Sequence, residues 1–448
     1  MSLRPRFTAV LALGALAHLA GCASYVPAPL PTTISADLTV SALNSSKGEG
    51  SAAGVDLNAP LDPAALAGIA VVLNPDLRAQ RARVGVAQAQ VFEAGLLPDP
   101  QFSASLDRPQ SAPGLVNALA ASLGLDTSAF YIRPQAVRGA RATERQTRLD
   151  LAWQEWQTGN QASVLAARIQ GLSAALVFAR EAESVSRSVL SRSLAAVGRG
   201  DLSAIDIEAR RLAEADAADR ARATERDLAA ARLQLNALLG LSPQTNIRLV
   251  ALTAPPTCSL SIDTLISRSL AERLDLAALR AGYEAQEAAV HVAVLQQYPR
   301  LNLSLNAARD TGAVRTNGVA IGFDLPVWNR NRGQIAVQSA TREQLRAEYE
   351  ARLFATRADL ATLVSALDIG RRQRADLQAQ VEPLRTTVEA FERAGARGDI
   401  AQVTAETARL SLLDKEIALA ALDQALAEQW RALQTAAGYL LETDACVA

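Results

Sequence analysis

The sequence is poor in the side chains that most often carry catalysis or bind metals. It has two histidines, one methionine and three cysteines in 448 residues. This scarcity removes most of the nitrogen and soft sulfur ligands of transition metals, so we expect no metal site and no cofactor. Within the chain that follows the N-terminal apolar run, His291 is the only histidine. It lies in a stretch rich in Ala and Val, which favours a packed or surface position on a helix over catalysis.

Aromatic residues are also scarce, and neither sign of charge is in large excess. Aromatics make up 4% of the chain, whereas 49% of residues are hydrophobic, so a core must be built mainly from Ala, Leu and Val, which suits closely packed helices. The 45 basic residues are interspersed with 46 acidic ones, which gives no bulk attraction to nucleic acid. We find no glycine-rich phosphate loop, zinc-protease motif or nucleophile elbow, and therefore expect no enzyme.

The N-terminus has the pattern of an export signal. Basic residues precede an apolar run, Phe7 to Ala20, which is too short to span a membrane as a helix. Leu19-Ala20-Gly21-Cys22 resembles the lipobox of bacterial lipoproteins. This predicts removal of residues 1–21 and acylation of Cys22, including palmitate; the alternative is a plain signal peptide with an incidental cysteine. Ala23 after the cysteine favours the outer membrane.

A long proline-free stretch organises the rest of the chain. Ala136–Val197 has apolar positions in a 4-3-4 rhythm, which predicts a helix on the order of 90 Å that must lie against other long helices, as in a coiled coil. Before it, residues 22–60 are rich in Pro, Ser, Gly, Thr and Ala without a period, which is typical of an extended tether, here attached to the lipid anchor.

The chain repeats itself at an offset of 198 or 199 residues. Arg199-Gly200-Asp201 and Arg397-Gly398-Asp399 are one of several matched pairs. Each copy predicts a short helix, two strands, a long helix, a tip turn and a return helix. We assign residues 61–252 to repeat 1, 253–262 to a linker, and 263–448 to repeat 2 with the C-terminal tail.

Both copies contain two runs in which apolar and polar residues alternate, such as Val319 to Leu325. Alternation alone fits a half-buried soluble sheet as well as a membrane sheet. The runs have about the length of transmembrane strands, and aromatic residues lie near their ends, namely Phe130, Tyr131, Tyr298 and Trp328. Four strands cannot close a barrel, so a membrane location requires an oligomer. Twofold assembly gives eight strands and threefold assembly twelve, and the pattern does not choose between them.

Together these features resemble the TolC-type outer membrane efflux protein family. The resemblance runs from about Leu61 to Leu441 and includes Asn74-Pro75-Asp76-Leu77 and the stretch Leu325–Gly333. It implies a mainly α fold with a transmembrane β part, in which a homotrimer forms a 12-stranded β-barrel that continues into a periplasmic α-helical tunnel. It also implies a lipid-anchored outer membrane lipoprotein that serves as the passive conduit of a tripartite efflux pump, with a periplasmic adaptor protein and an inner-membrane transporter as partners. Asn329-Arg330-Asn331-Arg332-Gly333 is similar to the branch serving heavy-metal efflux pumps.

The two Arg-Gly-Asp turns are the candidate functional site. A tight reversal favours glycine, and Asp201 or Asp399 is suited to cap the returning helix. In the resembled family this end of the tunnel meets the adaptor, so the resemblance implies adaptor-binding tips at Arg199, Gly200, Asp201, Arg397, Gly398 and Asp399. Together with these aspartates, the nearby acidic residues would form rings that favour cations at the tunnel entrance: Asp206, Glu208 and Glu406.

Two further cysteines, Cys258 in the linker and Cys446 in the tail, follow equivalent return helices. The repeat therefore places both at the same level, which predicts a disulfide between them; two free or separately buried thiols are the alternative. For the whole protein, the alternative function is a structural coiled-coil lipoprotein of the outer membrane without channel activity. That hypothesis explains the helices but gives the alternating hairpins no role.

Overall fold

The structure is a computed structural model, and it describes residues 25–30, 57, 59–110, 114–251, 256, 259–441 and 446–447. The chain divides into two compact units, residues 1–38 and 39–448. In the first unit the described segment, residues 25–30, has no regular secondary structure and is exposed. The predicted signal peptide and Cys22 lie outside the described residues.

The second unit contains the duplicated order of elements that the sequence predicts, with one additional short helix at the start of each copy. The first copy comprises α3 (Pro63–Leu73), α4 (Pro75–Gly95), β1 (Gln101–Asp107), β2 (Ala118–Asp126), α5 (Ala129–Gly198) and α6 (Ala204–Leu238). The second copy comprises α7 (Ile262–Glu272), α8 (Leu274–Leu295), β4 (Leu301–Arg309), β5 (Arg315–Phe323), α9 (Arg332–Arg397) and α10 (Gln402–Ala437). Two short strands, β3 (Ser259–Leu260) and β6 (Cys446–Val447), pair with each other.

The long helices α5 and α9 contain 70 and 66 residues, so each is about 100 Å long at about 1.5 Å per residue. Their sequences are dominated by Ala, Leu, Arg, Glu and Gln, which are strong helix formers. Pro134 lies in the second turn of α5, where its missing N–H removes one intrahelical hydrogen bond. One 18-residue window of α5 is apolar enough to cross a membrane, but half of it is buried inside the protein. That burial is typical of a helix in the core of a bundle.

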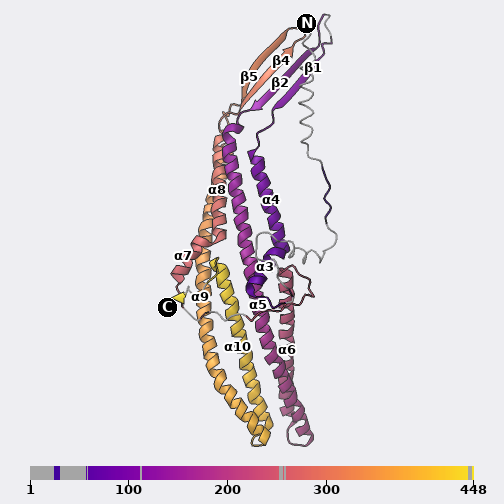
Figure 1. The fold of residues 1–448 in the computed structure, drawn as a ribbon, viewed down its shortest axis with the longest axis vertical. Helices are drawn as coiled ribbons and strands as arrows, with labels where there is room; N and C mark the ends of the chain where they lie inside the picture. Colours follow the sequence, from indigo (N-terminus) through magenta and orange to yellow (C-terminus); the bar gives the residue numbers. More distant parts are fainter. Residues whose placement is uncertain are drawn as a thin grey trace. The chain divides into compact units, whose positions relative to one another are not determined.

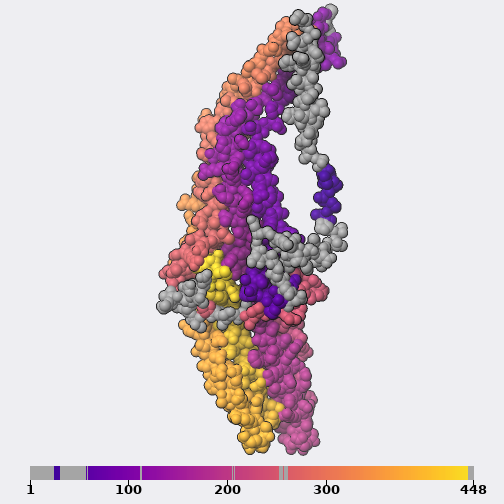
Figure 2. All heavy atoms as spheres, viewed as in Figure 1, coloured from indigo at the N-terminus to yellow at the C-terminus, as the bar shows by residue number. Residues whose placement is uncertain are grey.

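Helix α5 is the centre of the helical part, because it packs against α3, α4, α6, α8 and α10. Its contacts with α8 and α10 join the two copies. A Cβ atom on Gly171 of α5 would lie 2.4 Å from Cβ of Gln424 on α10, so glycine permits this close approach of the two helices. Figure 2 shows the hairpins α5–α6 and α9–α10 packed side by side.

Each copy has its own apolar core, built from equivalent elements. In the first copy α3 covers α5 and α6, with Ile69, Leu165 and Leu235 in one cluster. In the second copy α7 covers α9 and α10, with Leu265 and Leu360 in the cluster. Burying one such side chain contributes about 1.5–3 kcal/mol. The short helices α3 and α7 therefore close the cores where the return helices end.

The four longer strands form one antiparallel sheet in the order β1-β2-β4-β5. The hairpins of the two copies are joined by pairing of β2 with β4. This sheet lies at one end of the long helices, and the turns α5–α6 and α9–α10 lie at the other (Figure 1).

Candidate functional site

Strand register separates the sheet into one apolar and one polar face. Residues directly opposite in an antiparallel pair project to the same face, and Phe102 is opposite Leu123, which is opposite Leu305, which is opposite Val319. The large apolar side chains of all four strands consequently share one face. Those that are at least 42% exposed are Phe102, Leu106, Leu119, Leu123, Leu301, Leu303, Leu305, Val319, Ile321 and Phe323.

The opposite face carries small and polar side chains. Ser103 and Ser122 are opposite each other on it, and their Oγ atoms are 2.9 Å apart. Asn302, Ser304 and Asn306 of β4 continue this face. Within the described residues β1 and β5 are the edges of the sheet. An apolar face of this size and two open edges are not expected of a soluble monomer.

Aromatic side chains gather where the strands meet the helices, as the sequence predicts. Trp328 is 88% exposed, and Phe130 and Tyr298 are more than half exposed. Phe130 lies in the first turn of α5, whereas Tyr298 precedes β4 and Trp328 follows β5. Such amphipathic or apolar rings are typical of the boundary between a membrane and water.

The two tip turns have the same backbone geometry. Gly200 and Gly398 have φ of +83° and +79°, a left-handed conformation that glycine adopts at little cost. Asp201 N–H donates to the Ala196 carbonyl at 2.9 Å, and Asp399 N–H donates to the Ala394 carbonyl at 2.9 Å. Each long helix thus ends in a Schellman motif, which satisfies carbonyls that the helix end would otherwise leave unpaired.

The expected capping of the return helices by these aspartates is wrong for the second copy. The N-cap of α10 is Ala401, which makes no side-chain cap hydrogen bond. Asp399 Oδ2 instead accepts from Arg397 Nε at 2.8 Å, and Asp201 Oδ2 accepts from Arg199 Nε at 2.9 Å. The aspartates are spaced two residues from these arginines and lie before the return helices start. All four side chains are more than half exposed, so each tip presents an open arginine–aspartate pair.

The three acidic residues predicted at the entrance differ in their surroundings. Glu208 is exposed and pairs with Arg211 at 2.9 Å. Asp206 lies in α6, but its side chain is outside the part of the structure that is described. Glu406 does not fit an exposed acidic ring, because it is 9% exposed and its Oε1 lies 2.5 Å from Nη1 of Arg192 on α5. Its charge is therefore balanced within the protomer.

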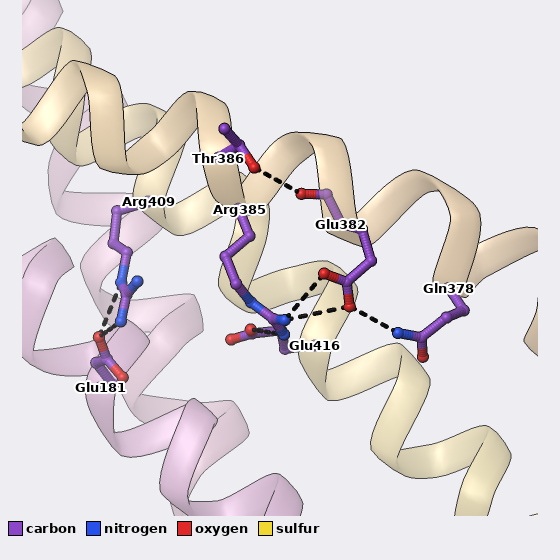
Figure 3. Close-up of polar contacts among 7 residues, drawn as sticks. All are labelled: Glu181, Gln378, Glu382, Arg385, Thr386, Arg409 and Glu416. Carbon is purple, nitrogen blue, oxygen red and sulfur yellow. Dashed lines mark hydrogen bonds and ion pairs between the residues drawn. The ribbon is translucent and has the colours of Figure 1, made fainter.

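A layer of ion pairs behind the tips was not predicted. Arg409 of α10 binds Glu181 of α5, with Nε to Oε1 at 2.9 Å, and Arg385 of α9 binds Glu416 of α10 at 3.0 Å (Figure 3). The hydrogen bond to Glu416, with the charge of Glu382, raises the pKa of Arg385. Burial alone would lower the pKa of Arg409, but the bond to Glu181 and the neighbouring carboxylates raise it. These pairs hold α5, α9 and α10 together near the tips.

The predicted disulfide falls partly outside the described residues, since Cys258 is not described. The adjoining strands do pair, with Leu260 opposite Cys446. The linker and the tail therefore meet, and the disulfide itself stays a prediction. Among the described residues, no group of three or more His, Cys, Asp or Glu side chains could hold a metal ion. His291 is exposed on α8.

Comparison with known proteins identifies relatives of this arrangement. Residues 265–439 match the family model of the outer membrane efflux protein. The cobalt-zinc-cadmium resistance protein CzcC of Cupriavidus metallidurans is 26% identical over 331 residues, which are 72% of this chain and 77% of CzcC.

Solved structures share the fold over most of the chain. The Campylobacter jejuni CmeC outer membrane channel has a TM-score of 0.70 at 14% identity, over 93% of this chain and 94% of CmeC. CusC, whose structures concern transmembrane channel formation, has a TM-score of 0.69 at 16% identity, over 93% of this chain and 100% of CusC. The expected fold class is confirmed: mainly α with a β part, built from a duplicated unit of strand hairpin and long helix. Residues 265–439 match the outer membrane efflux protein family, and over most of its length the chain has the fold of the CmeC and CusC structures.

Proposed function

We propose that this chain is the outer membrane channel of a tripartite efflux pump. The observation that carries the proposal is the four-stranded sheet, with one exposed apolar face and two open edges. A lipid bilayer accommodates such a face but no unpaired strand edge. The sheet must therefore close with the sheets of other protomers, so that β5 of one protomer pairs with β1 of the next.

Three protomers give a barrel of twelve strands, which is the assembly implied by the TolC-type family. The polar face then lines a wet lumen, and the apolar face contacts lipid. The helices continue the channel into the periplasm, because they follow the strands at one end of the sheet. The tips, about 100 Å from the barrel by the length of α5, are the surfaces that meet a periplasmic adaptor, which links the channel to an inner-membrane transporter.

The conduit is passive and has no catalytic role. Its lumen, lined by Ser, Asn, Gly and Thr, favours hydrated solutes without strong selection among them. We propose divalent heavy-metal cations as cargo, and the name of the relative CzcC supports this choice. The exposed Glu208 and the tip aspartates would attract cations at the entrance. Energy and most of the substrate selection then reside in the transporter.

Anchoring by Cys22 is a further part of the proposal. Acyl chains on this cysteine would supplement the barrel, and two or more chains give stable attachment where one is marginal. Mass spectrometry of the mature N-terminus should find a lipidated cysteine. An unmodified N-terminus at Ala23 or later would contradict this.

The alternative of a structural coiled-coil lipoprotein without channel activity is not supported. It assigns no role to the exposed apolar face, and the family match is to efflux proteins. Conductance separates the two functions. The purified protein should conduct ions steadily across a planar lipid bilayer, and protein that enters the bilayer without conducting would contradict the proposal.

Two neighbouring positions on β5 provide a matched pair of variants for the same assay. Val319 lies on the apolar face and Ala320 on the polar face. Val319→Arg should impair insertion, because an arginine facing lipid near the bilayer centre costs about 2–4 kcal/mol. Ala320→Arg should insert and reduce cation conductance. Equal behaviour of the two variants would contradict the assignment of faces.

A further inference from the structure

The two ends of the apolar sheet face differ in chemistry. Where the strands meet the helices, the flanking side chains are aromatic, as at Tyr298 and Trp328. At the other end, Arg309 is the last residue of β4 and Arg315 is the first residue of β5, and the two are directly opposite in register. Both are exposed. Basic side chains thus replace aromatic ones at the end of the sheet that is distant from the helices.

Register places both arginines on the apolar face. Arg309 is opposite Leu119, which lies on this face together with Leu106. Arg315 is four positions before Val319 on β5, and residues two or four apart along a strand project to the same side. Under the proposed function, these guanidinium groups therefore project toward lipid.

The arginines lack a balancing carboxylate in the part of the chain that the structure describes. Neither has an ion-pair partner there. Asp310 is adjacent, but its Oδ1 accepts the backbone N–H of Val314 at 2.9 Å and so serves the turn. Asp107, at the end of β1, projects to the polar face because it is opposite Ala118. Like charges directly opposite on a sheet destabilise it, and a bound anion would offset their repulsion.

We propose that Arg309 and Arg315 together bind the phosphate groups of an anionic lipid in the outer leaflet of the membrane. The inference rests on the proposed function, because periplasmic helices put the opposite end of the sheet at the cell surface. Guanidinium groups bind phosphate through paired, charge-assisted hydrogen bonds. Their long apolar stems can follow the lipid-facing surface while the charged heads reach the headgroup layer.

Barrel closure would enlarge the site. Strand β5 is an edge of the sheet, so its Arg315 would lie beside the β1 strand of the neighbouring protomer. Arg108 directly follows β1 and is exposed. Within one protomer, a hydrogen bond connects the β1–β2 and β4–β5 loops, since Val116 N–H donates to the Thr311 carbonyl at 2.9 Å. Each of three junctions between copies would then offer a basic rim to lipid phosphate.

The test compares thermal unfolding of the full chain in lipid nanodiscs of defined composition. One set contains phosphatidylcholine alone, a second adds diphosphorylated lipid A, a third adds dephosphorylated lipid A, and a fourth adds millimolar inorganic phosphate to phosphatidylcholine. The test variant is Arg309→Gln with Arg315→Gln. The control is Arg300→Gln, which removes an exposed arginine just before β4, at the helix end of the sheet.

Diphosphorylated lipid A should raise the melting temperature of the wild type and of R300Q by several degrees. It should raise that of the double variant by less than half as much. Equal shifts in all three proteins would overturn the inference and leave the channel intact, as would an equal shift with dephosphorylated lipid A or with inorganic phosphate. Failure of the wild type to enter nanodiscs would instead overturn the proposed function and this inference with it.

Discussion

The two repeats build the same junction with different chemistry. The junction is the point where the two short helices of a repeat meet the end of its return helix. In repeat 1, Asn74 caps α4: its Oδ1 accepts from the backbone N–H groups of Asp76 and Leu77, each at 3.0 Å. Its Nδ2 donates to the Leu238 carbonyl at the end of α6, at 2.8 Å. A neutral amide therefore serves both helix ends.

Repeat 2 places Arg273 at the equivalent position. Its Nη1 donates to the Ala436 carbonyl at 2.6 Å, while Nε and Nη2 donate to the two oxygens of Asp275 at 3.0 and 2.7 Å. Arg352 of α9 donates to Asp275 at 2.8 Å, and Arg273 lies over the ring of Trp153 on α5, 4.8 Å from its centroid. The equivalent carbonyl at the end of the return helix is hydrogen-bonded here too, but by a buried ionic cluster.

The comparison shows that the duplication retained a geometric requirement rather than a residue. A carbonyl at the end of each return helix needs a donor, because a buried unpaired carbonyl is costly. The ionic version also reaches α5 of the other repeat through Trp153. Stability of repeat 2, and its attachment to repeat 1, should depend on charge, whereas the junction of repeat 1 should not.

The largest expected effect comes from removing the carboxylate of repeat 2. Asp275→Asn leaves Arg273, which is 3% exposed, without its charge partner, and breaking such a buried pair costs about 3–5 kcal/mol. The matched substitution in repeat 1, Asp76→Asn, affects an exposed residue and should change stability by less than about 0.5 kcal/mol. Thermal unfolding of the two variants measures the difference. Similar melting temperatures would contradict the comparison.

Acid titration sharpens the same contrast. Burial raises the pKa of Asp275, but the hydrogen bonds and charges of Arg273 and Arg352 outweigh burial and lower it below its ordinary value. A lowered folded pKa stabilises the protein above the unfolded pKa of about 3.9, and that contribution is lost as the pH falls through the folded value. The gap in melting temperature between wild type and D275N should stay constant from pH 8 to 5 and shrink below about pH 4. A gap that changes between pH 8 and 6 would refute this assignment.

The next largest effect should be equal in the two repeats. A Cβ atom at Gly200 or Gly398 would meet no atom within 4 Å beyond the chain neighbours, but φ near +80° is unfavourable for valine, which costs about 1–2 kcal/mol at each turn. Gly198→Val, beside the turn but without positive φ, is the control. The double variant should form trimers and insert while losing adaptor crosslinking and efflux. Undiminished efflux would show that the turns have no role in docking.

An effect no larger than that of one glycine substitution is expected at the neutral junction. Asn74→Ala removes the cap of α4 and the donor to Leu238, which should cost about 1–2 kcal/mol. Asn74→Asp keeps the capping oxygen and loses only the donor, so it should cost less. Denaturant unfolding at two salt concentrations checks both variants. A strong salt dependence of either cost would indicate that repeat 1 also relies on charge.

The smallest effect should come from the tip aspartates. Asp201→Ala and Asp399→Ala each break an exposed ion pair, which is worth less than about 1 kcal/mol. Melting temperatures should therefore change little and by the same amount in both repeats. A loss of several degrees in one variant alone would show that its tip is part of a packed structure.

The sequence predicted what is periodic or repeated. The alternation in residues 319–325, the 198-residue offset and the Arg-Gly-Asp turns were enough to place strands, long helices and tips. Helices α3 and α7 were missed. The sequence of α3, PAALAGIAVVL, is apolar on nearly all sides, so it has no amphipathic period to find.

Contacts between distant segments were beyond the reach of sequence patterns. Glu406 looked like an exposed acid near a turn, but Arg192, more than two hundred positions earlier, neutralises it. The Glu181–Arg409 pair joins the repeats across a similar separation. Aspartate at a turn suggested a helix cap, yet Arg397 competes for that carboxylate from two residues away. Tertiary packing decides such partners, and local spacing does not reveal them.

The central claim is that the sheets of neighbouring protomers pair through their edges, and disulfide crosslinking of the two edges tests it most directly. In a chain with serine at positions 258 and 446, Ser105→Cys on β1 is combined with cysteine at Gly318, Ala320 or Gly322 of β5, all on the polar face. Oxidation in outer membranes should give covalent dimers and trimers for at least one pair and nothing larger. Only monomers for every pair, or a series that stops at dimers, would contradict the twelve-stranded barrel.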